Sequence, residues 1–160
     1  MIKIICVGKI KEKYLNDAIE EYKKRLLKYV KINIIEVTDI DNQSIDVILL
    51  KEKELIEKYI ESKDYVITLE IDGNMLSSLE FARKIDNIFN TNSNITFIIG
   101  GSYGLHSDIK LRSNYKLSFS KLTFPHQLFR VILLEQIYRT FKINSNEAYH
   151  KWYAFKKIKY

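Results

Sequence analysis

The sequence predicts an α/β domain with a mainly parallel sheet and helices on both of its faces. Short β-branched runs such as 2–7 and 95–99 alternate along the chain with longer segments whose apolar residues recur at helical spacing. This alternation is typical of βαβ units, whose strands pair in parallel. A chain of 160 residues suits one domain, and no linker or repeat divides it. We expect a single domain over 1–160, with 144–160 as a C-terminal tail.

The N-terminal part predicts two strands and two amphipathic helices. Residues 1–8 are mostly apolar and read as a strand, whereas 11–29 carry one apolar stripe on an otherwise charged helix. The β-branched, alternating run 31–37 predicts the second strand, and a polar turn rich in Asp and Asn follows at 38–44. A second amphipathic helix is expected over 45–61.

The middle of the chain continues the same alternation. A strand is expected at 65–71, and the turn-forming residues 72–74 should close it. Ser77 and Glu80 have the spacing of a capping box, in which each residue bonds the other's backbone N–H. A third helix should therefore begin there and run to about Asn90.

The last part predicts two more strands, 94–99 and 115–119, separated by a short helix at 106–112. A long helix should follow over 125–143, with Pro125 at its first turn. Apolar residues cover most of this helix's circumference, so it should be buried on all sides. A central core position or a subunit interface would bury it, and we favour the interface.

Composition limits where the protein works and what it binds. No apolar run approaches the roughly 18 residues that a membrane span needs, and the N-terminal run is too short for a signal peptide. The lone Cys6 suggests a reducing compartment, so we expect a cytoplasmic protein without a membrane partner. The net charge of +6 favours a polyanionic partner, although a Lys-, Ile- and Asn-rich bias explains it equally well.

A glycine cluster marks the first candidate binding segment. Gly100, Gly101 and Gly104 directly follow the strand 94–99, where glycine lets the backbone approach a ligand. In an open α/β sheet, ligands bind at the carboxyl ends of the strands. The loop matches neither a dinucleotide fingerprint nor a phosphate-binding P-loop. A tight structural turn explains it about as well.

The segment 117–126 forms the second candidate, because its small hydroxyl residues leave backbone groups free to bind a planar heterocycle. It leads into a helix N-terminus, which attracts anions. His126 and Arg130 share one face there, and a basic pair at that end suggests a bound phosphate or nucleotide. The alternative is that Arg130 pairs with an acidic side chain elsewhere. Glu135 and Arg139 read as an ordinary helix ion pair.

Other reactive residues form no convincing site. Ser102, His106 and Asp108 lie too close along one loop to form a hydrolase triad. The three histidines have no ligand spacing, so we expect no metal. The aromatic and basic tail is either a solvated terminus or a segment that docks on RNA or a partner subunit.

Five segments together resemble one family: the opening I-x-V-G-K-x-K-E-K-Y, the strand 66–71 with Gly73, the loop IIGGSYGL, the run LSFSKLTFPHQLFRVILLEQIYR, and EAYHK at 147–151. They are similar to the small ribosomal RNA methyltransferases of the SPOUT superfamily. The closest match is to those that methylate N3 of pseudouridine 1915 in 23S rRNA. The resemblance covers residues 1 to about 151.

The resemblance implies a C-terminal deep trefoil knot, S-adenosylmethionine as cofactor, and a homodimer with shared active sites. In this sequence the implied cofactor contacts are Leu69, Gly100, Phe119, Ser120, Lys121, Leu122, Thr123 and Phe124. Tyr149, His150 and Lys151 match the tail that completes the partner's pocket. The sequence departs from the family at Asn146, where the motif has glycine, and in the extension from Trp152 to Tyr160.

The reaction that the resemblance implies is an in-line displacement, in which N3 of pseudouridine attacks a sulfonium methyl group. Alignment and desolvation would supply much of the acceleration. Arg130 would hold a phosphate or stabilise the deprotonated imide, and either His126 or His150 would accept the proton. A small protein should recognise the shape of the assembled ribosome. The alternatives are a knotted transfer RNA methyltransferase and a non-catalytic ribosome- or RNA-binding factor.

Overall fold

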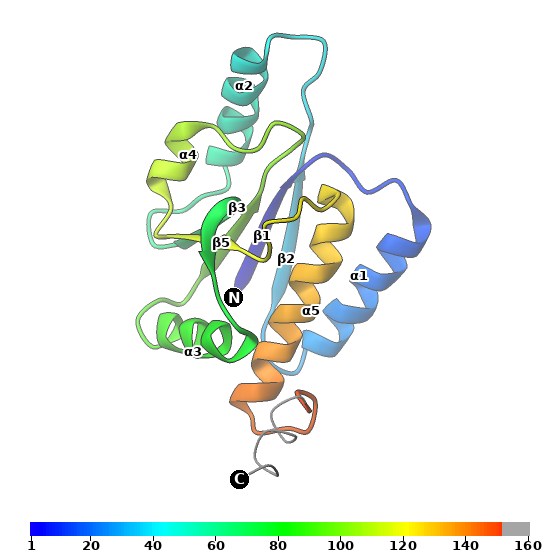
Figure 1. Cartoon of the computed structure of the whole chain (residues 1–160), viewed down its shortest axis with the longest axis vertical. Coiled ribbons are helices and arrows are strands. Elements are labelled where there is room, and N and C mark those ends of the chain that lie inside the picture. The colour runs from blue at the N-terminus through cyan, green and yellow to red at the C-terminus, as the bar shows by residue number, and fades with distance from the viewer. Residues whose placement is uncertain (152–160) are drawn as a thin grey trace.

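The computed structural model describes residues 1–151, and the extension from Trp152 to Tyr160 lies outside them. Five strands alternate with five helices along these residues (Figure 1). The strands are β1 (Ile2–Val7), β2 (Ile32–Val37), β3 (Tyr65–Met75), β4 (Ile95–Ile99) and β5 (Tyr115–Ser118). The helices are α1 (Lys13–Leu26), α2 (Ile45–Glu57), α3 (Ser78–Phe89), α4 (Ser107–Arg112) and α5 (His126–Asn144).

The strands form one sheet in the order β2-β1-β4-β3-β5, and every neighbouring pair runs parallel. The predicted parallel α/β architecture is thereby confirmed. All residues of β1 and β4 are buried, as expected for central strands covered on both faces. The order brings the carboxyl ends of β4, β3 and β5 side by side, where the next connections of the chain must meet. The knot that the resemblance implies stays a prediction.

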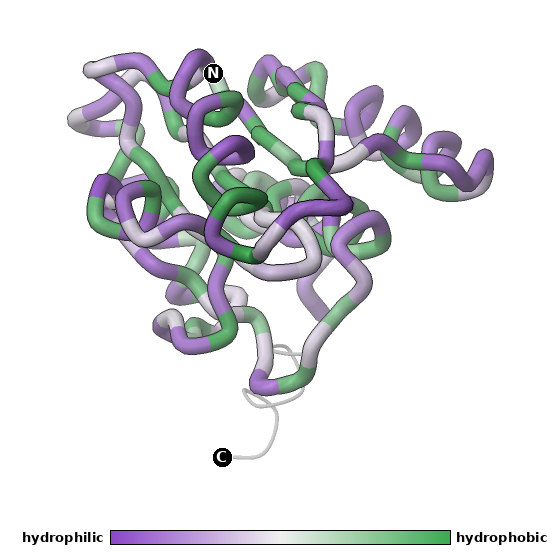
Figure 2. The backbone as a smooth tube through the Cα atoms, turned by 90° about the horizontal axis from the view of Figure 1, so that it is seen from above, coloured by the Kyte–Doolittle hydropathy of each residue, from purple (hydrophilic) through white to green (hydrophobic). Residues whose placement is uncertain are grey.

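Helices cover both faces of the sheet, as predicted. Alternate residues of β1 point to opposite sides, so Ile4 joins the core under α1, α3 and α5, whereas Ile5 joins the core under α2 and α4. Figure 1 shows these two helical layers on either side of the strands. Along the peripheral helices, hydrophobic and hydrophilic residues alternate, so each helix turns one face inward (Figure 2).

α5 packs between α1 and α3, and its inner residues Leu133, Leu134 and Ile137 are fully buried. Much of its apolar character therefore serves the core of one subunit. Leu128 on the same helix is 41% exposed, and a subunit interface there stays a prediction. Among the described residues, no helix is long and apolar enough to cross a membrane.

The capping box at the start of α3 is confirmed. Ser77 Oγ accepts a hydrogen bond from the Glu80 N–H at 3.3 Å, and the Glu80 carboxylate accepts one from the Ser77 N–H at 2.7 Å. Two of the donors that a helix start leaves unpaired are satisfied in this way.

The expected turn at 72–74 is wrong, because β3 continues to Met75 beside β5. The register shifts within this stretch, and both Leu69 and Asn74 pair with Leu117. At Gly73 a Cβ would lie 2.7 Å from the backbone carbon of Leu117, so only glycine fits this close approach. Glycine among turn-forming residues here marks an irregularity inside a strand rather than its end.

Candidate active site

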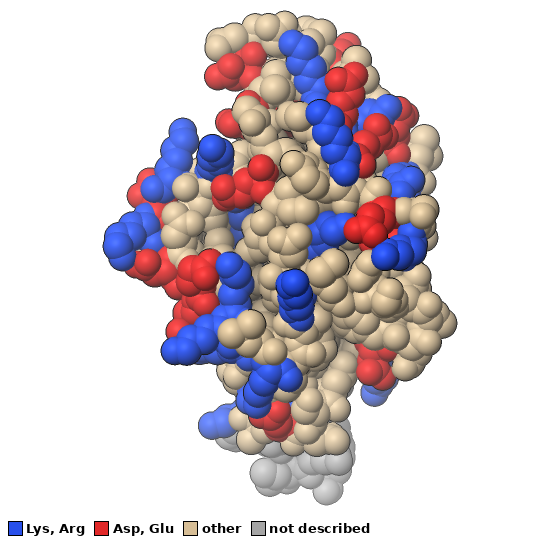
Figure 3. Space-filling model, turned by 180° about the vertical axis from the view of Figure 1, so that it is seen from behind, with Lys and Arg blue, Asp and Glu red and all other residues tan. Residues whose placement is uncertain are grey.

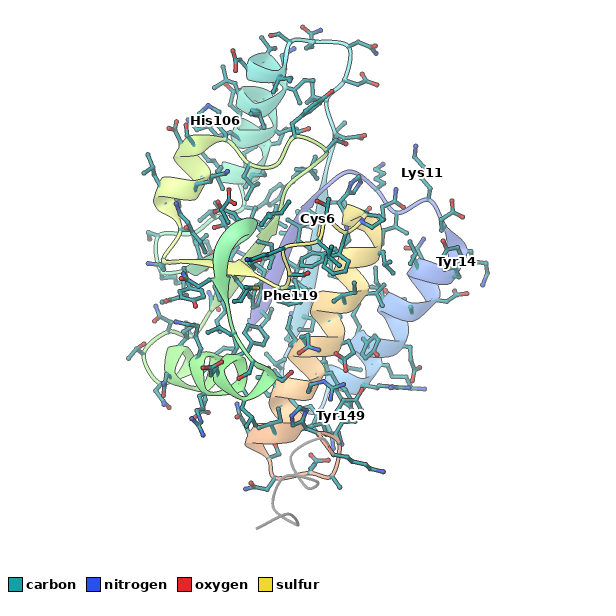
Figure 4. All side chains as sticks on the ribbon, in the orientation of Figure 1. Cys6, Lys11, Tyr14, His106, Phe119 and Tyr149 are labelled. Carbon is teal, nitrogen blue, oxygen red and sulfur yellow. The ribbon has the colours of Figure 1, made fainter. Side chains whose placement is uncertain are left out.

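A cavity of about 410 Å³ opens at the carboxyl ends of β3, β4 and β5. Its walls come from residues 69–72 within β3, from the loop between β4 and α4, and from the connection between β5 and α5. This is the edge at which α/β proteins with parallel sheets bind their ligands. In Figure 4, Phe119 marks the cavity from the side of β5 and α5.

Most of the predicted cofactor residues line this cavity. Those that do are Leu69, Gly100, Phe119, Ser120, Leu122, Thr123 and Phe124. His126 lines it too, whereas Lys121, Arg130, Tyr149, His150 and Lys151 do not. A single chain therefore brings together most of the predicted cofactor contacts and one histidine, and leaves the tail outside the cavity.

The glycine loop needs glycine for steric reasons. A Cβ on Gly100 would lie 2.4 Å from the carbonyl oxygen of Gly104, because the loop folds back on itself. The Gly104 N–H donates to the Gly101 carbonyl at 3.1 Å, and Gly104 has a φ of 81°, which glycine adopts without strain. The tight turn that the sequence left as an alternative is real, and the same turn forms a wall of the cavity.

Hydrogen bonds within the connection from β5 to α5 hold it in a turn. Ser118 Oγ donates to the Ser120 carbonyl at 3.0 Å, and Ser120 Oγ accepts from the Leu122 N–H at 3.0 Å. Both serine hydroxyls therefore maintain the turn. The aromatic rings of Phe119, Phe124 and Phe129 pack together, with centroids 5.0 and 5.7 Å from Phe129. They give the cavity an apolar wall that suits a flat ring.

Three charged residues that line the cavity were missed in the sequence, namely Glu70, Asp72 and Lys110. Glu70 lies at its wall with a side chain only 10% exposed, and it accepts a hydrogen bond from Thr68 Oγ1 at 2.6 Å. Lys110 of α4 also lines the cavity, with Nζ 3.6 Å from the Glu70 carboxylate. A glutamate ending the apolar run VITL was the available signal for Glu70, since carboxylates at such strand ends can bind ribose hydroxyls. Lys110 gave no signal.

Arg130 pairs with an acidic side chain, the alternative left open above. Its side chain is 1% exposed, and its guanidinium donates to Glu36 at 2.6 Å. It also donates to the carbonyls of Val7 and Gly8 at 3.0 and 2.7 Å. Arg130 thus ties the first turns of α5 to the carboxyl ends of β1 and β2.

His126 lies between the cavity and the end of β1. A Cβ on Gly8 would come within 3.6 Å of its Nε2. Burial, followed by the nearby Arg130 charge, lowers the pKa of His126, while Asp39 acts in the opposite direction. The imidazole is therefore neutral at pH 7, which leaves it able to accept a proton.

The predicted tail residues lie at the other end of α5, held by the Glu135–Arg139 ion pair, whose prediction is confirmed at 2.5 Å. The Tyr149 hydroxyl donates to Glu135 at 3.2 Å, and its ring lies 4.8 Å from the Arg139 guanidinium. Arg139 also contacts Nδ1 of His150 at 3.2 Å. Because a guanidinium can only donate, this Nδ1 is the acceptor, and a neutral His150 ring carries its proton on Nε2.

Distance separates the tail from the cavity of its own subunit. α5 has 19 residues, so at 1.5 Å per residue it spans roughly 27 Å. His126 at its first turn lines the cavity, whereas Tyr149 follows its last turn, and Figure 4 shows Tyr149 far from Phe119. In the part of the chain that the structure describes, no group of three or more His, Cys, Asp or Glu side chains could hold a metal ion.

Comparisons with known proteins agree with this arrangement. A family described as "Predicted SPOUT methyltransferase" matches residues 1–150. Proteins named ribosomal RNA large subunit methyltransferase H from Clostridium botulinum and Clostridium tetani are each 56% identical over 157 residues, and the one from Clostridium kluyveri is 54% identical. Each alignment covers 94% of this chain and 99% of the relative.

Among solved structures, a probable methylase family protein from Haemophilus influenzae Rd KW20 has a similar fold, with a TM-score of 0.57. The match covers 94% of this chain and 69% of that protein. At 16% sequence identity, the likeness supports the fold alone.

Proposed function

Because this chain belongs to the SPOUT methyltransferase family, we propose that it is an S-adenosylmethionine-dependent methyltransferase acting on the RNA of the large ribosomal subunit. The names of relatives at 54–56% identity support the substrate class. The proposed target is N3 of pseudouridine 1915 in 23S rRNA, in the cytoplasm. The observation that carries most weight is the cavity at the strand ends, lined by all the expected cofactor contacts except Lys121.

The cavity fits the cofactor by size and chemistry. Its volume of about 410 Å³ lies within the usual range for small-molecule sites. The Phe119 and Phe124 side chains offer an apolar wall to the adenine ring, and the Glu70 carboxylate can accept hydrogen bonds from ribose hydroxyls. The glycine turn lets the backbone approach closely. When bound, S-adenosylmethionine would supply an electrophilic methyl group on its sulfonium.

The substrate nitrogen must lose its proton as it becomes methylated, and we assign the proton to His126. This residue lines the cavity and is neutral at pH 7, so its imidazole can accept a proton. His150 is the less suitable acceptor, because its Nδ1 already contacts the Arg139 guanidinium, which can only donate. Arg130 acts by holding the end of β1 beside His126.

The active site proposed here is shared between two copies. Tyr149, His150 and Lys151 follow a helix of roughly 27 Å whose first turn lines the cavity. This length keeps them away from the cavity of their own chain, which supports the proposal that they act in the cavity of a partner. A homodimer would contain two such sites.

Recognition is proposed to depend on the shape of the assembled ribosome. On the back of the molecule, Lys and Arg side chains are interspersed with Asp and Glu, so that face offers no uniform basic field (Figure 3). The net charge of +6 would then act through individual phosphate contacts, whose contribution to affinity falls with salt.

A labelled-methyl transfer assay tests the proposal with ribosomes, isolated 23S rRNA and transfer RNA offered in parallel. We expect incorporation into ribosomes or large subunits, and mapping of the product to N3 of one pseudouridine. Incorporation into transfer RNA alone would identify the related knotted enzyme instead. Failure to bind S-adenosylmethionine would leave a non-catalytic RNA-binding factor.

The His126 assignment predicts a pH profile. A neutral imidazole is needed, and its lowered pKa keeps the residue neutral from alkaline pH down to about 6.5, the usual value. The methyl transfer rate at saturating substrates should therefore fall only below about pH 6.5, where His126 becomes protonated and can no longer accept a proton. His126→Asn should lower the rate by about 10²-fold and remove the acid limb. An acid limb that persists in His126→Asn would rule out this assignment.

A further inference from the structure

One carboxylate gathers three donors where the tail leaves α5. Glu147 accepts hydrogen bonds from Lys142 at 2.5 Å, from Lys28 at 3.2 Å and from the hydroxyl of Tyr29. Lys142 belongs to α5, whereas Lys28 and Tyr29 follow the end of α1. The Lys142 ammonium, followed by the Tyr29 hydroxyl, lowers the pKa of Glu147 to about 2. The carboxylate is therefore ionised at neutral pH.

Hydrogen bonds also hold the backbone around Glu147 in a turn. Asn146 has a φ of 53°, the left-handed conformation that ends many helices, and asparagine tolerates it better than most residues. The Glu147 N–H donates to the Lys142 carbonyl at 2.9 Å, and the Tyr149 N–H donates to the Glu147 carbonyl at 2.9 Å. The asparagine at the family's glycine position is thus compatible with the turn.

The residues just beyond Glu147 are those expected to act in the partner. Tyr149 packs at 5.0 Å against the ring of Tyr138, a residue of α5 that also contacts Tyr22 and Tyr29. The segment 145–151 therefore forms a hook, fastened to both α1 and α5. A free tail would lose conformational freedom each time it entered a pocket, and a preformed hook reduces that loss.

We infer that Glu147 is a positioning residue, which fastens the hook to its own subunit so that Tyr149 and His150 enter the partner's cavity already oriented. The inference rests on the proposed function, because it assumes that the tail completes the site of a second copy. Glu147 itself does not touch the reacting groups and acts only by positioning Tyr149 and His150.

Glu147→Gln tests the inference, because it preserves shape and removes the charge. We expect kcat for methyl transfer to ribosomes to fall about tenfold, while the Kd for S-adenosylmethionine stays within twofold of wild type. The amides of Glu147 and Tyr149 should lose protection from hydrogen exchange, and those in the middle of α5 should keep theirs. Lys142→Gln should reproduce both effects in part, and the double variant should be no worse than Glu147→Gln alone, since the ion pair between Lys142 and Glu147 is already lost in that variant.

Glu21→Gln is the matched control, because it removes a carboxylate that pairs with Arg25 at 2.8 Å on the surface of α1. It should leave kcat and exchange unchanged. Unchanged kcat in both Glu147→Gln and Lys142→Gln would overturn the inference, as would a loss of cofactor affinity or of global stability that matches the loss of rate. A wild-type protein that transfers no methyl group would refute the proposed function instead, while hydrogen exchange would still report whether Glu147 holds the hook.

Discussion

Gly100→Ala is expected to raise the Kd for S-adenosylmethionine by at least about 10²-fold. The new Cβ would lie 2.4 Å from the Gly104 oxygen and 2.6 Å from its carbonyl carbon, both of them backbone atoms. Since no rotamer change relieves that contact, the loop must move by about 1 Å, and displacements of this size can cost 10²-fold at a site built on geometry. Isothermal titration with the cofactor measures the effect.

Gly101→Ala is the matched control one residue away. Its Cβ would meet a methyl group of Val7 at 3.0 Å and the Glu52 carboxylate at 3.4 Å, which are side-chain atoms rather than the loop's own backbone. We expect the Kd of Gly101→Ala to stay within about fivefold of wild type. The Kd of Gly100→Ala, in which the loop must move, should rise by about 10²-fold. Equal losses in the two variants would contradict a backbone cause.

Arg130→Met is expected to lower the free energy of unfolding by about 3 kcal/mol, at the low end of the usual cost of breaking a buried ion pair. The low end applies because the Glu36 side chain is 33% exposed, so water can solvate it when its partner is lost. The Val7 and Gly8 carbonyls would lose a donor as well. Urea unfolding at constant pH measures the difference.

Arg25→Met provides the comparison, because Arg25 pairs with Glu21 on the exposed surface of α1. Such a solvent-exposed pair contributes little to stability, so Arg25→Met should unfold at nearly the same urea concentration as wild type. Arg130→Ala should also lower methyl transfer to ribosomes, by no more than the about 10²-fold expected for His126→Asn, yet leave cofactor affinity within a few-fold, because Arg130 does not line the cavity. Loss of cofactor binding in Arg130→Ala would refute this indirect role. An Arg130→Met protein with the same free energy of unfolding as Arg25→Met would contradict a stabilising buried ion pair.

Local patterns in the sequence predicted the elements well. Period-two and helical spacing located the strands and helices, and the Ser77–Glu80 pair identified one helix start. What failed depended on distant residues. Gly73 looked like part of a turn because nothing nearby shows that Leu117 will lie against it. The partner of Arg130, Glu36, is 94 residues away, so spacing alone could not choose between an ion pair and a bound anion.

The segments whose backbone forms the wall of the candidate site could be identified from the sequence. Gly100 stood out because three of the five glycines of this chain lie at 100–104, and the segment around Phe119 stood out because small hydroxyl residues follow a strand and lead into a helix start. Glu70 and Lys110 reach the same cavity from β3 and α4, and only the strand order β4-β3-β5 brings them there. Pairing between strands that are not consecutive in the chain has no local signature.

Helix α5 sets two quantities at once, the distance between the cavity at its first turn and the hook after its last turn, and the rotation of one relative to the other. Each residue of an α-helix adds 1.5 Å and turns the chain by about 100°. One inserted residue in α5 would therefore barely lengthen the molecule, yet it would rotate Glu147 a quarter-turn or more away from Lys28 and Tyr29, which follow α1. Lineages that lengthen or shorten this segment should do so by whole turns, or rebuild the end of α1 to match.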